Sequence, residues 1–325
     1  MDFFKKVIRL AKQNKKSIVF PEAGFSERII QAVLKMAKYK ICNPILIGDK
    51  NDLINKCHKL SKFTIIDPKT FSKTNELAEK LFEARRHKGL TLEDSKELIL
   101  DPFYFATMLV KCNYADAMIG GAEVSTAKTL KPALTLLRKN NEFVNSYMIM
   151  VGKNNITDNP FFMTDCGLIE EPNLEQLPVM AKRVCDELKV FTELSPRVAF
   201  LSYSTYGSAE SDITLKMKNA CLKFKEQNPS ILSEGEIQLD AALIERVAKT
   251  KLGNNKDYYG KANVLVFPDL NSANICYKAI SYFGNLYAIG PITVGLDKPV
   301  NDLSRGCTVK DIIILSAITV LQCKN

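Results

Sequence analysis

Residues 298–311 read KPVNDLSRGCTVKD, and they place polar and charged side chains directly before an apolar segment that begins at Ile312. A polar loop that leads into a buried helix is held rigidly, as a binding or catalytic site requires. Gly306 either permits a backbone shape that other residues avoid or lets a ligand come close. Thr308 is typical of an N-cap, which would put Asp311 in the first helical turn. The unpaired N–H groups of a helix start favour an anion there.

The composition indicates a globular protein that is large enough for two domains. The chain has 325 residues, of which 46% are hydrophobic and 25% charged. Its first residues lack the apolar core of a signal peptide, and no apolar run approaches the roughly 20 residues of a membrane span. We therefore expect a cytoplasmic protein without a membrane partner.

Cysteine and histidine usage argues against two kinds of site. The nine cysteines are an odd number without a C-x-x-C pair, and there are only two histidines. A disulfide framework and a zinc site are both disfavoured, and we expect reduced, mostly buried thiols and no metal.

The formal net charge is +9, which raises the possibility of nucleic-acid binding. The lysines are scattered, with acidic residues between them, and they form no basic stripe with interleaved aromatic residues. A solvated, lysine-rich surface is therefore favoured over a nucleic-acid partner. The charge can also help to draw anionic substrates towards a cleft.

Short β-rich runs alternate with helical patterns along the chain. Residues 17–20 form a strand pattern, 27–39 an amphipathic helical pattern and 44–47 a second strand pattern, which together predict a βαβ unit and a parallel sheet. Further strands are predicted at 115–119, 143–151, 161–164, 198–204, 264–267 and 286–289, and a buried helix at 308–322. Several of these strands end in Ser, Asp or Gly. Ligands of open α/β sheets bind beyond the carboxyl ends of the strands, so these loops are the expected site.

Several longer segments carry a resemblance to a known family. They read AD-x-x-IGGAEVSTAKT at 115–129, SYSTYGSAES at 202–211, SEGEIQLDAA at 233–242, VFPDLNSANICYK at 266–278 and AIGPITVGLDKPVNDLSRGC at 288–307. With these segments the chain resembles the phosphate acetyltransferase (phosphotransacetylase) family over nearly its whole length, and PVNDLSRG is the most specific part.

The resemblance implies an architecture. It consists of two α/β/α domains with a mainly parallel sheet in each, an isocitrate/isopropylmalate dehydrogenase-like fold with the active site in the interdomain cleft. A discontinuous first domain would hold residues 1–144 and 298–325, and the second domain would hold residues 145–297. A homodimer is also implied.

The resemblance implies the reversible reaction acetyl-CoA + phosphate = coenzyme A + acetyl phosphate, by direct attack of the coenzyme A thiolate in a ternary complex. Coenzyme A, acetyl phosphate and inorganic phosphate would be substrates, and no resident cofactor would be needed. The chemistry calls for a base, a cation for the phosphate and a donor for the developing oxyanion. Two alternatives remain: a phosphate butyryltransferase-like enzyme with another acyl preference, and a non-catalytic binding protein on the same fold.

Asp311 is the candidate base by this resemblance. From the residues alone, T-x-x-D before an apolar run also resembles a capping box, so Asp311 has a structural interpretation as well. A helix N-terminus favours the charged carboxylate but lowers its basicity. A base at this position would therefore need surroundings that exclude water, or proton removal concerted with attack.

Four neighbouring residues complete the predicted catalytic loop. Arg305 would grip phosphate and stabilise transition-state charge, because its planar fork suits phosphate oxygens. Ser304 would donate a hydrogen bond to the carbonyl or the thiol, and Gly306 would contact the substrate. Cys307, beside an arginine and a helix start, would have a lowered pKa and could form a thioester. The resemblance instead implies that Cys307 lies near the substrate without attacking it.

Residues 120–126 combine a strand end, two glycines, hydroxyl side chains and a helix start, which either hold a phosphate or simply cap a helix. The resemblance makes Ser125 and Thr126 substrate-binding residues. It also places Lys131 where the family typically has an arginine, in T-V-R-P-A-L. A lysine keeps the positive charge of an arginine but lacks its bidentate guanidinium. We therefore expect the substitution to affect the affinity for the anion more than the reaction itself.

Residues 84–89, ARRHKG, end a predicted helix. Basic residues before a glycine are a usual stop signal of a helix. The resemblance instead implies that an arginine here contributes to the coenzyme A and phosphate site, with Arg85 as the candidate and Arg86 as the alternate.

Overall fold

The computed structural model describes residues 3–139, 142–152, 159–253, 258 and 260–323. The chain divides into two compact units. The first unit comprises Met1–Val144 and Gly295–Asn325, and the second comprises Asn145–Val294.

The first unit is built on a parallel sheet with the strand order β11-β4-β1-β2-β3. Its strands are β1 (Ser17–Phe20), β2 (Asn43–Ile47), β3 (Thr64–Ile66), β4 (Ala117–Gly120) and β11 (Val300–Asp302). Strands β1, β2 and β4 are nearly continuous apolar runs, as expected for parallel strands that are covered on both faces.

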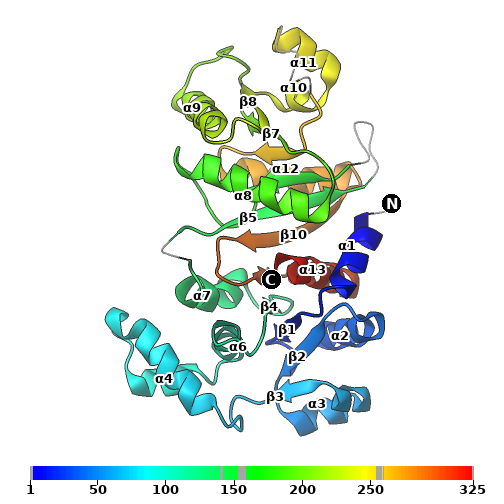
Figure 1. The fold of residues 1–325 in the computed structure, drawn as a ribbon, viewed down its shortest axis with the longest axis vertical. Coiled ribbons are helices and arrows are strands. Elements are labelled where there is room, and N and C mark those ends of the chain that lie inside the picture. Colours follow the sequence, from blue (N-terminus) through cyan, green and yellow to red (C-terminus); the bar gives the residue numbers. More distant parts are fainter. Residues whose placement is uncertain (1–2, 140–141, 153–158, 254–257, 259, 324–325) are drawn as a thin grey trace. The chain divides into compact units, whose positions relative to one another are not determined.

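Helices cover both faces of this sheet (Figure 1). The helices of the first unit are α1 (Phe3–Lys12), α2 (Glu27–Tyr39), α3 (Lys50–Lys56), η1 (His58–Lys62), α4 (Thr74–Arg85), η2 (Arg86–Lys88), α5 (Leu92–Leu98), α6 (Pro102–Lys111), α7 (Thr126–Leu136) and α13 (Val309–Gln322). Among them, α4 contacts α5 and α6 and lies away from the strands in Figure 1. Helix α13 packs against α1, α2 and the central strands, whereas α6 and α7 pack together against β4, β1 and β11.

Helix α13 is central to the first unit because it is apolar on nearly every side. Its side chains from Ile312 to Val320 are buried or nearly so, and α1 lies beside it in Figure 1. The buried side chain of Asn301 in β11 donates to Thr319 Oγ1 at 2.8 Å and to Gln322 Oε1 at 2.7 Å. The strand that precedes the predicted catalytic loop is thereby bonded to the helix that follows it.

The second unit contains a mixed sheet with the order β10-β5-β6-β9-β7-β8. Strand β5 pairs antiparallel with β10 and β6, and the other pairs are parallel. The strands are β5 (Asn145–Val151), β6 (Phe161–Thr164), β7 (Arg197–Leu201), β8 (Leu232–Ile237), β9 (Val264–Val266) and β10 (Tyr287–Val294). The helices are α8 (Gln176–Phe191), α9 (Asp212–Gln227), α10 (Leu239–Leu243), α11 (Glu245–Lys251) and α12 (Leu270–Phe283).

The structure confirms the predicted fold class, a mixed α/β protein with mainly parallel sheets. It corrects one point in the stretch that was predicted as a continuous loop, because Val300–Asp302 form β11 and pair in parallel with Met118–Gly120 of β4. A three-residue strand of sequence VND carries no periodicity of its own. Its extended form depends on a neighbour that is remote in sequence.

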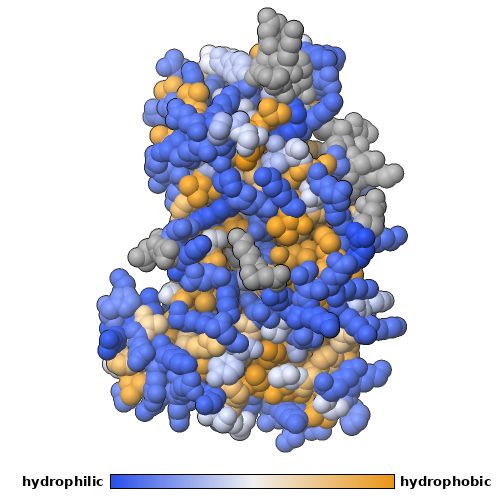
Figure 2. Space-filling model, in the orientation of Figure 1, coloured by the Kyte–Doolittle hydropathy of each residue, from blue (hydrophilic) through white to orange (hydrophobic). Residues whose placement is uncertain are grey.

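Figure 2 shows how hydrophilic and hydrophobic residues are distributed over one face of the molecule. Hydrophilic side chains cover most of the face drawn in Figure 2, and hydrophobic residues lie between them in separate patches. Among the residues that the structure describes, no helix has both the length and the apolar character needed to cross a bilayer.

Candidate active site

Three loops of the first unit meet at one edge of its sheet. Strands β11, β4 and β1 are neighbours and run in parallel, so the segments 303–308, 121–125 and 21–26 all leave from their carboxyl ends. From β1 the chain crosses to β2 and β3 on one side, whereas β4 and β11 lie on the other. The boundary between β1 and β4 is thus a topological switch point, the usual ligand position in an open α/β sheet.

The predicted catalytic loop contains a tight turn. Cys307 N–H donates to the Ser304 carbonyl at 2.8 Å, and Gly306 N–H donates to Ser304 Oγ at 3.3 Å. Ser304, Arg305 and Gly306 are exposed, whereas Cys307 is buried. Among the described residues, no hydrogen bond or ion pair engages the Arg305 guanidinium.

The structure decides between the two explanations for Gly306. Its backbone is outside the left-handed region, and a Cβ there would meet only Ser304 Oγ, at 3.8 Å. The prediction that Gly306 is required for an unusual backbone conformation is therefore wrong. Close approach of a ligand to this exposed glycine stays a prediction.

Asp311 forms the capping box that its spacing indicates. Thr308 N–H donates to Asp311 Oδ2 at 2.6 Å and the Thr308 hydroxyl donates to it at 2.8 Å, while Asp311 N–H donates back to Thr308 Oγ1. Burial raises the pKa of the Asp311 carboxyl, and the Thr308 N–H bond opposes this. The expected loss of basicity at a helix start is thus outweighed by desolvation.

The structure corrects the expected acidity of Cys307. Burial raises the pKa of its thiol, the Arg28 guanidinium lowers it, and Glu22 and Glu123 raise it further. The lowered pKa expected from Arg305 and the helix start is therefore wrong, because desolvation and two carboxylates outweigh one cation. A protonated thiol is a poor nucleophile.

The helix start after β4 lies next to the predicted catalytic loop. Ser125 is the N-cap of α7, with its hydroxyl accepting from Lys128 N–H at 3.4 Å. Thr126 donates its hydroxyl hydrogen to Asp302 Oδ2 at 2.6 Å, which joins α7 to the end of β11. Lys131 is exposed on the same helix.

Arg85 lies further along the chain, at the last residue of α4 and half-buried. Its charge opposes the rise in the pKa of Tyr104 on α6 that burial and Asp101 cause. Gly89 adopts a left-handed conformation (φ 86°) just beyond η2, so the stop-signal interpretation of this segment is confirmed. No hydrogen bond or ion pair within the described ranges links Arg85 or Lys131 to residues 304–311.

Two buried carboxyl groups at this edge were not predicted. Glu22, with 0% exposure, accepts from Ala122 N–H and Glu123 N–H, each at 2.9 Å. Asp302 is 1% exposed, and burial raises its pKa to about 6, opposed by the hydroxyls of Thr126 and Thr129 and reinforced by Glu22. Glu22 could have been found from its place just after the strand predicted at 17–20, where an acidic side chain need not be on the surface. Asp302 is the last residue of β11, and its burial had no such signal because that strand was not predicted.

Arg28 in the first turn of α2 was also missed, although the chain has only nine arginines among its 45 basic residues. Its guanidinium forms an ion pair with Glu123 at 3.0 Å and donates to carbonyl groups of two other loops. Its position after the carboxyl end of β1 was the available signal.

Two segments of the second unit that carried the family resemblance also lie together. The segment at 202–211 follows β7, and the segment at 233–242 begins within the neighbouring strand β8 and continues beyond its end. Gly207 N–H donates to Glu236 Oε1 at 2.6 Å, and Gln238 N–H donates to Thr205 Oγ1 at 3.0 Å. The carboxyl edge of the second sheet is thereby ordered by side chains of both segments.

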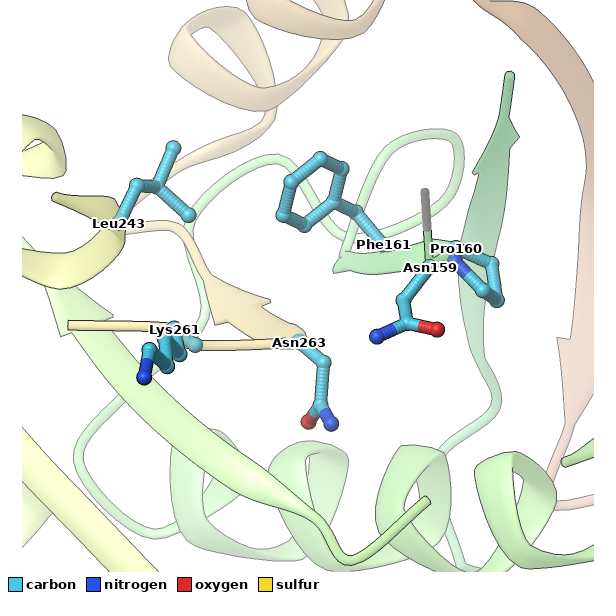
Figure 3. A pocket seen from close by; sticks show the side chains of 7 residues that line it. Asn159, Pro160, Phe161, Leu243, Lys261 and Asn263 are labelled. Atoms are coloured by element: carbon cyan, nitrogen blue, oxygen red, sulfur yellow. The ribbon is translucent and has the colours of Figure 1, made fainter. Parts of the chain in front are cut away.

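A cavity of about 210 Å³ lies at the opposite edge of the second sheet, near the amino ends of β6 and β9. Figure 3 shows the side chains that line it, which are those of Asn159, Pro160, Phe161, Leu243, Lys261, Ala262 and Asn263. None of the predicted site residues lines this cavity.

The fold is shared with enzymes of other chemistry. The chain is similar to a crystal structure of 4-hydroxythreonine-4-phosphate dehydrogenase from Klebsiella pneumoniae, with a TM-score of 0.52 and 11% identity over 95% of this chain and 98% of that one. At this identity the likeness concerns the fold alone, and it confirms the dehydrogenase-like architecture.

The family follows from much closer likenesses. The chain belongs to the phosphate acetyl/butaryl transferase family, whose model matches residues 2–320. It is 40% identical to the phosphate acetyltransferase of Acetivibrio thermocellus, over 99% of this chain and 98% of that protein. The corresponding Bacillus subtilis protein is 39% identical, with 94% of both chains covered. A phosphotransacetylase structure from Streptococcus pyogenes has a TM-score of 0.92 and 34% identity, over 99% of this chain and 98% of that one.

The burial of Asp302 predicts a dependence of stability on pH. Its pKa is raised from 3.8 to about 6, so the folded state binds the proton more tightly than the unfolded state. This contribution to stability is present below about pH 4 and is lost as pH rises through 6, by up to about 3 kcal/mol. Asp302→Asn keeps an acceptor for Thr126 and cannot ionise. The melting temperature of the variant relative to the unaltered protein should therefore rise across this window, and a constant difference would refute the assignment.

The state of Cys307 predicts a mechanism class. Because its thiol is buried with a raised pKa, Cys307→Ala should keep substantial turnover, and no acetylated enzyme should accumulate during the reaction. Measuring the intact mass of enzyme that has been quenched during turnover tests this. The control is Cys112→Ala, which removes a half-buried cysteine at the C-cap of α6. Ping-pong kinetics or an acetyl group on Cys307 would restore the thioester route.

Proposed function

We propose that this chain is a phosphate acetyltransferase in which the coenzyme A thiolate attacks acetyl phosphate directly within a ternary complex. The observation that carries the proposal is the segment from the end of β11 to the first turn of α13, residues 302–311. It presents an arginine, a serine and a glycine on the surface, and the arginine's guanidinium has no hydrogen bond or ion pair among the described residues; the last residue of the segment is a carboxylate with a raised pKa. The identity to phosphate acetyltransferases over the full chain supports the same activity.

The bonds made and broken define what each residue does. The thiol loses its proton to Asp311, and the sulfur bonds to the acetyl carbon of acetyl phosphate. The bond between that carbon and the bridging oxygen then breaks, and phosphate leaves with the electron pair. The reverse reaction follows the same steps backwards, and no electron transfer or resident cofactor is involved.

Asp311 is the proposed base on two grounds. First, desolvation raises the pKa of its carboxyl group, which brings that pKa closer to the pKa of a thiol. Second, the N–H and hydroxyl groups of Thr308 hold Asp311 Oδ2 in one orientation. An ordinary aspartate titrates near 4 and a thiol near 8.5, so removal of the proton would be concerted with attack.

Arg305 and Ser304 are proposed to meet the charge that develops in the transition state. The Arg305 guanidinium is exposed and can present two parallel donors to phosphate oxygens, which suits a dianionic leaving group. The Ser304 hydroxyl accepts from Gly306 N–H, which leaves its own hydrogen available to the acetyl carbonyl.

The remaining predicted residues are proposed to bind substrate. Ser125 and Thr126 lie at the N-terminus of α7, where backbone N–H groups and the helix dipole favour a phosphate. Gly306 and Cys307 would border the acyl group and the thiol. Lys131 and Arg85 would supply positive charge to coenzyme A or phosphate.

We also propose a homodimer in the cytoplasm. Support for the dimer comes from α12, on which Ile275, Tyr282 and Phe283 share one side, with Phe283 92% exposed. Support for a reducing compartment comes from the nine free cysteines, of which five are buried.

The activity itself is tested by the formation of acetyl-CoA from acetyl phosphate and coenzyme A. Asp311→Asn should lower kcat by roughly 100-fold or more with little loss of stability, because general bases supply about 10²–10⁴ and asparagine still caps a helix. Arg305→Lys should also lower kcat, because lysine keeps the positive charge but lacks the planar guanidinium that can donate two parallel hydrogen bonds to phosphate.

Thr308→Ala is the matched control for Asp311→Asn, since it removes the cap and leaves the carboxylate. It should lose about 1 kcal/mol of stability and retain much more turnover than Asp311→Asn. Near-normal kcat in a folded Asp311→Asn variant would contradict the assignment of the base.

Lys131 offers a test of anion binding. If its exposed ammonium faces a substrate phosphate, Lys131→Arg should lower the Michaelis constant for acetyl phosphate or phosphate, with a smaller change in kcat, because a bidentate contact is gained. Steady-state kinetics in both substrates measures this. An unchanged or higher constant would mean that Lys131 does not face the anion or has surroundings suited to an ammonium.

A further inference from the structure

The guanidinium of Arg28, which follows the loop after β1, is bonded to the other two loops at the carboxyl edge of the first sheet, 121–125 and 303–308. Nη1 donates to the carbonyl oxygens of Arg305 and Cys307, both at 2.8 Å. Nη2 donates to the Ala122 carbonyl and pairs with Glu123 Oε1 at 3.0 Å, which also accepts from Nε at 3.3 Å. These acceptors account for every N–H group of a guanidinium.

The two carbonyls bound by Nη1 flank Gly306, which gives this contact its importance. Among the described residues, the turn from Ser304 to Cys307 is otherwise closed only by its own bonds to Ser304. When one nitrogen holds the carbonyls on both sides of the glycine, the peptide planes between them are held as well. The direction in which the Arg305 side chain leaves the backbone therefore depends on Arg28.

Arg28 is itself held by a carboxylate network. Glu123 Oε1 accepts from the Ser26 hydroxyl at 2.7 Å, and Glu123 N–H donates to the buried Glu22. The Ala122 N–H is bound to the same Glu22. The loops after β1 and β4 thus form a rigid support, and Arg28 connects the catalytic turn to it.

We propose that Arg28 is a positioning residue of the active site, which acts on Arg305 and on the start of α13 through the backbone of residues 305–307. The proposal rests on the acetyltransfer reaction proposed above. All its donors are used by protein acceptors, so its effect is on geometry and not on substrate charge. A lysine cannot replace it, because a single ammonium cannot hold the two carbonyls of the turn and Glu123 in this planar arrangement.

The experiment compares Arg28→Lys and Arg28→Ala with the unaltered protein, using kcat, both Michaelis constants and melting temperature. We expect kcat to fall roughly 10- to 100-fold in both variants, since a displacement of about 1 Å can cost about 100-fold. The Michaelis constant for coenzyme A should change much less than kcat. Added guanidinium ion should restore part of the kcat of Arg28→Ala.

Two controls separate positioning from stability. Glu123→Gln removes the ion pair and leaves the carbonyls of residues 305 and 307 bound to Arg28, so it should lose less kcat than Arg28→Lys. Arg9→Ala, an exposed arginine of α1, should keep normal kcat and should not respond to guanidinium ion.

Three results would overturn the proposal: unaltered kcat in folded Arg28→Lys, a loss of kcat that only follows the loss of folded protein, or no response of folded Arg28→Ala to guanidinium ion. An unaltered protein that lacks acetyl transfer to phosphate would refute the proposed function instead. In that case, the amide exchange of residues 304–307 in Arg28→Lys still tests the positioning, because faster exchange is expected and an unchanged rate contradicts it.

Discussion

The parallel pairing of β4 with β1 on one side and β11 on the other is the constraint on which the site depends. It aligns the carboxyl ends of three strands that are far apart in sequence, so that their loops reach one edge of the sheet. Strand β11 has only three residues, and the bonds from Asn301 to α13 give it a second attachment. Because β11 is anchored on both sides, the turn that follows it begins from a defined place.

Charge burial is the cost of this arrangement. Glu22 and Asp302 are almost completely removed from water, and desolvation raises the pKa of both carboxyl groups. Glu22 recovers part of this cost by accepting from the backbone of the neighbouring loop, and Asp302 by accepting from Thr126. Groups with shifted pKa values are common at active sites, because function requires rigidly placed polar groups even where their burial lowers the stability of the fold.

At the start of α13, one carboxylate has both an observed structural contact and a proposed chemical role. Asp311 caps the helix through Thr308, and burial raises its pKa in spite of that cap. The cap interpretation and the base hypothesis thus describe one carboxylate, whose orientation comes from the first role. At Cys307, by contrast, burial and the neighbouring carboxylates raise the pKa of the side chain and so favour the protonated thiol over the reactive thiolate.

The sequence by itself determined the local features. Apolar periodicity predicted the α/β class and the buried α13, and the T-x-x-D spacing predicted the capping box, because both depend on residues a few positions apart. Only the tertiary structure decided that residues 300–302 are a strand, that the Cys307 thiol has a raised pKa, and that Arg28 holds the turn at 304–307. Each of these depends on partners that are remote along the chain: Met118 to Gly120 for the strand, Glu22 and Glu123 for the thiol, and a helix that begins some 280 positions earlier for the turn. Burial and long-range hydrogen bonds arise only when the sheet has formed, and no local pattern encodes them.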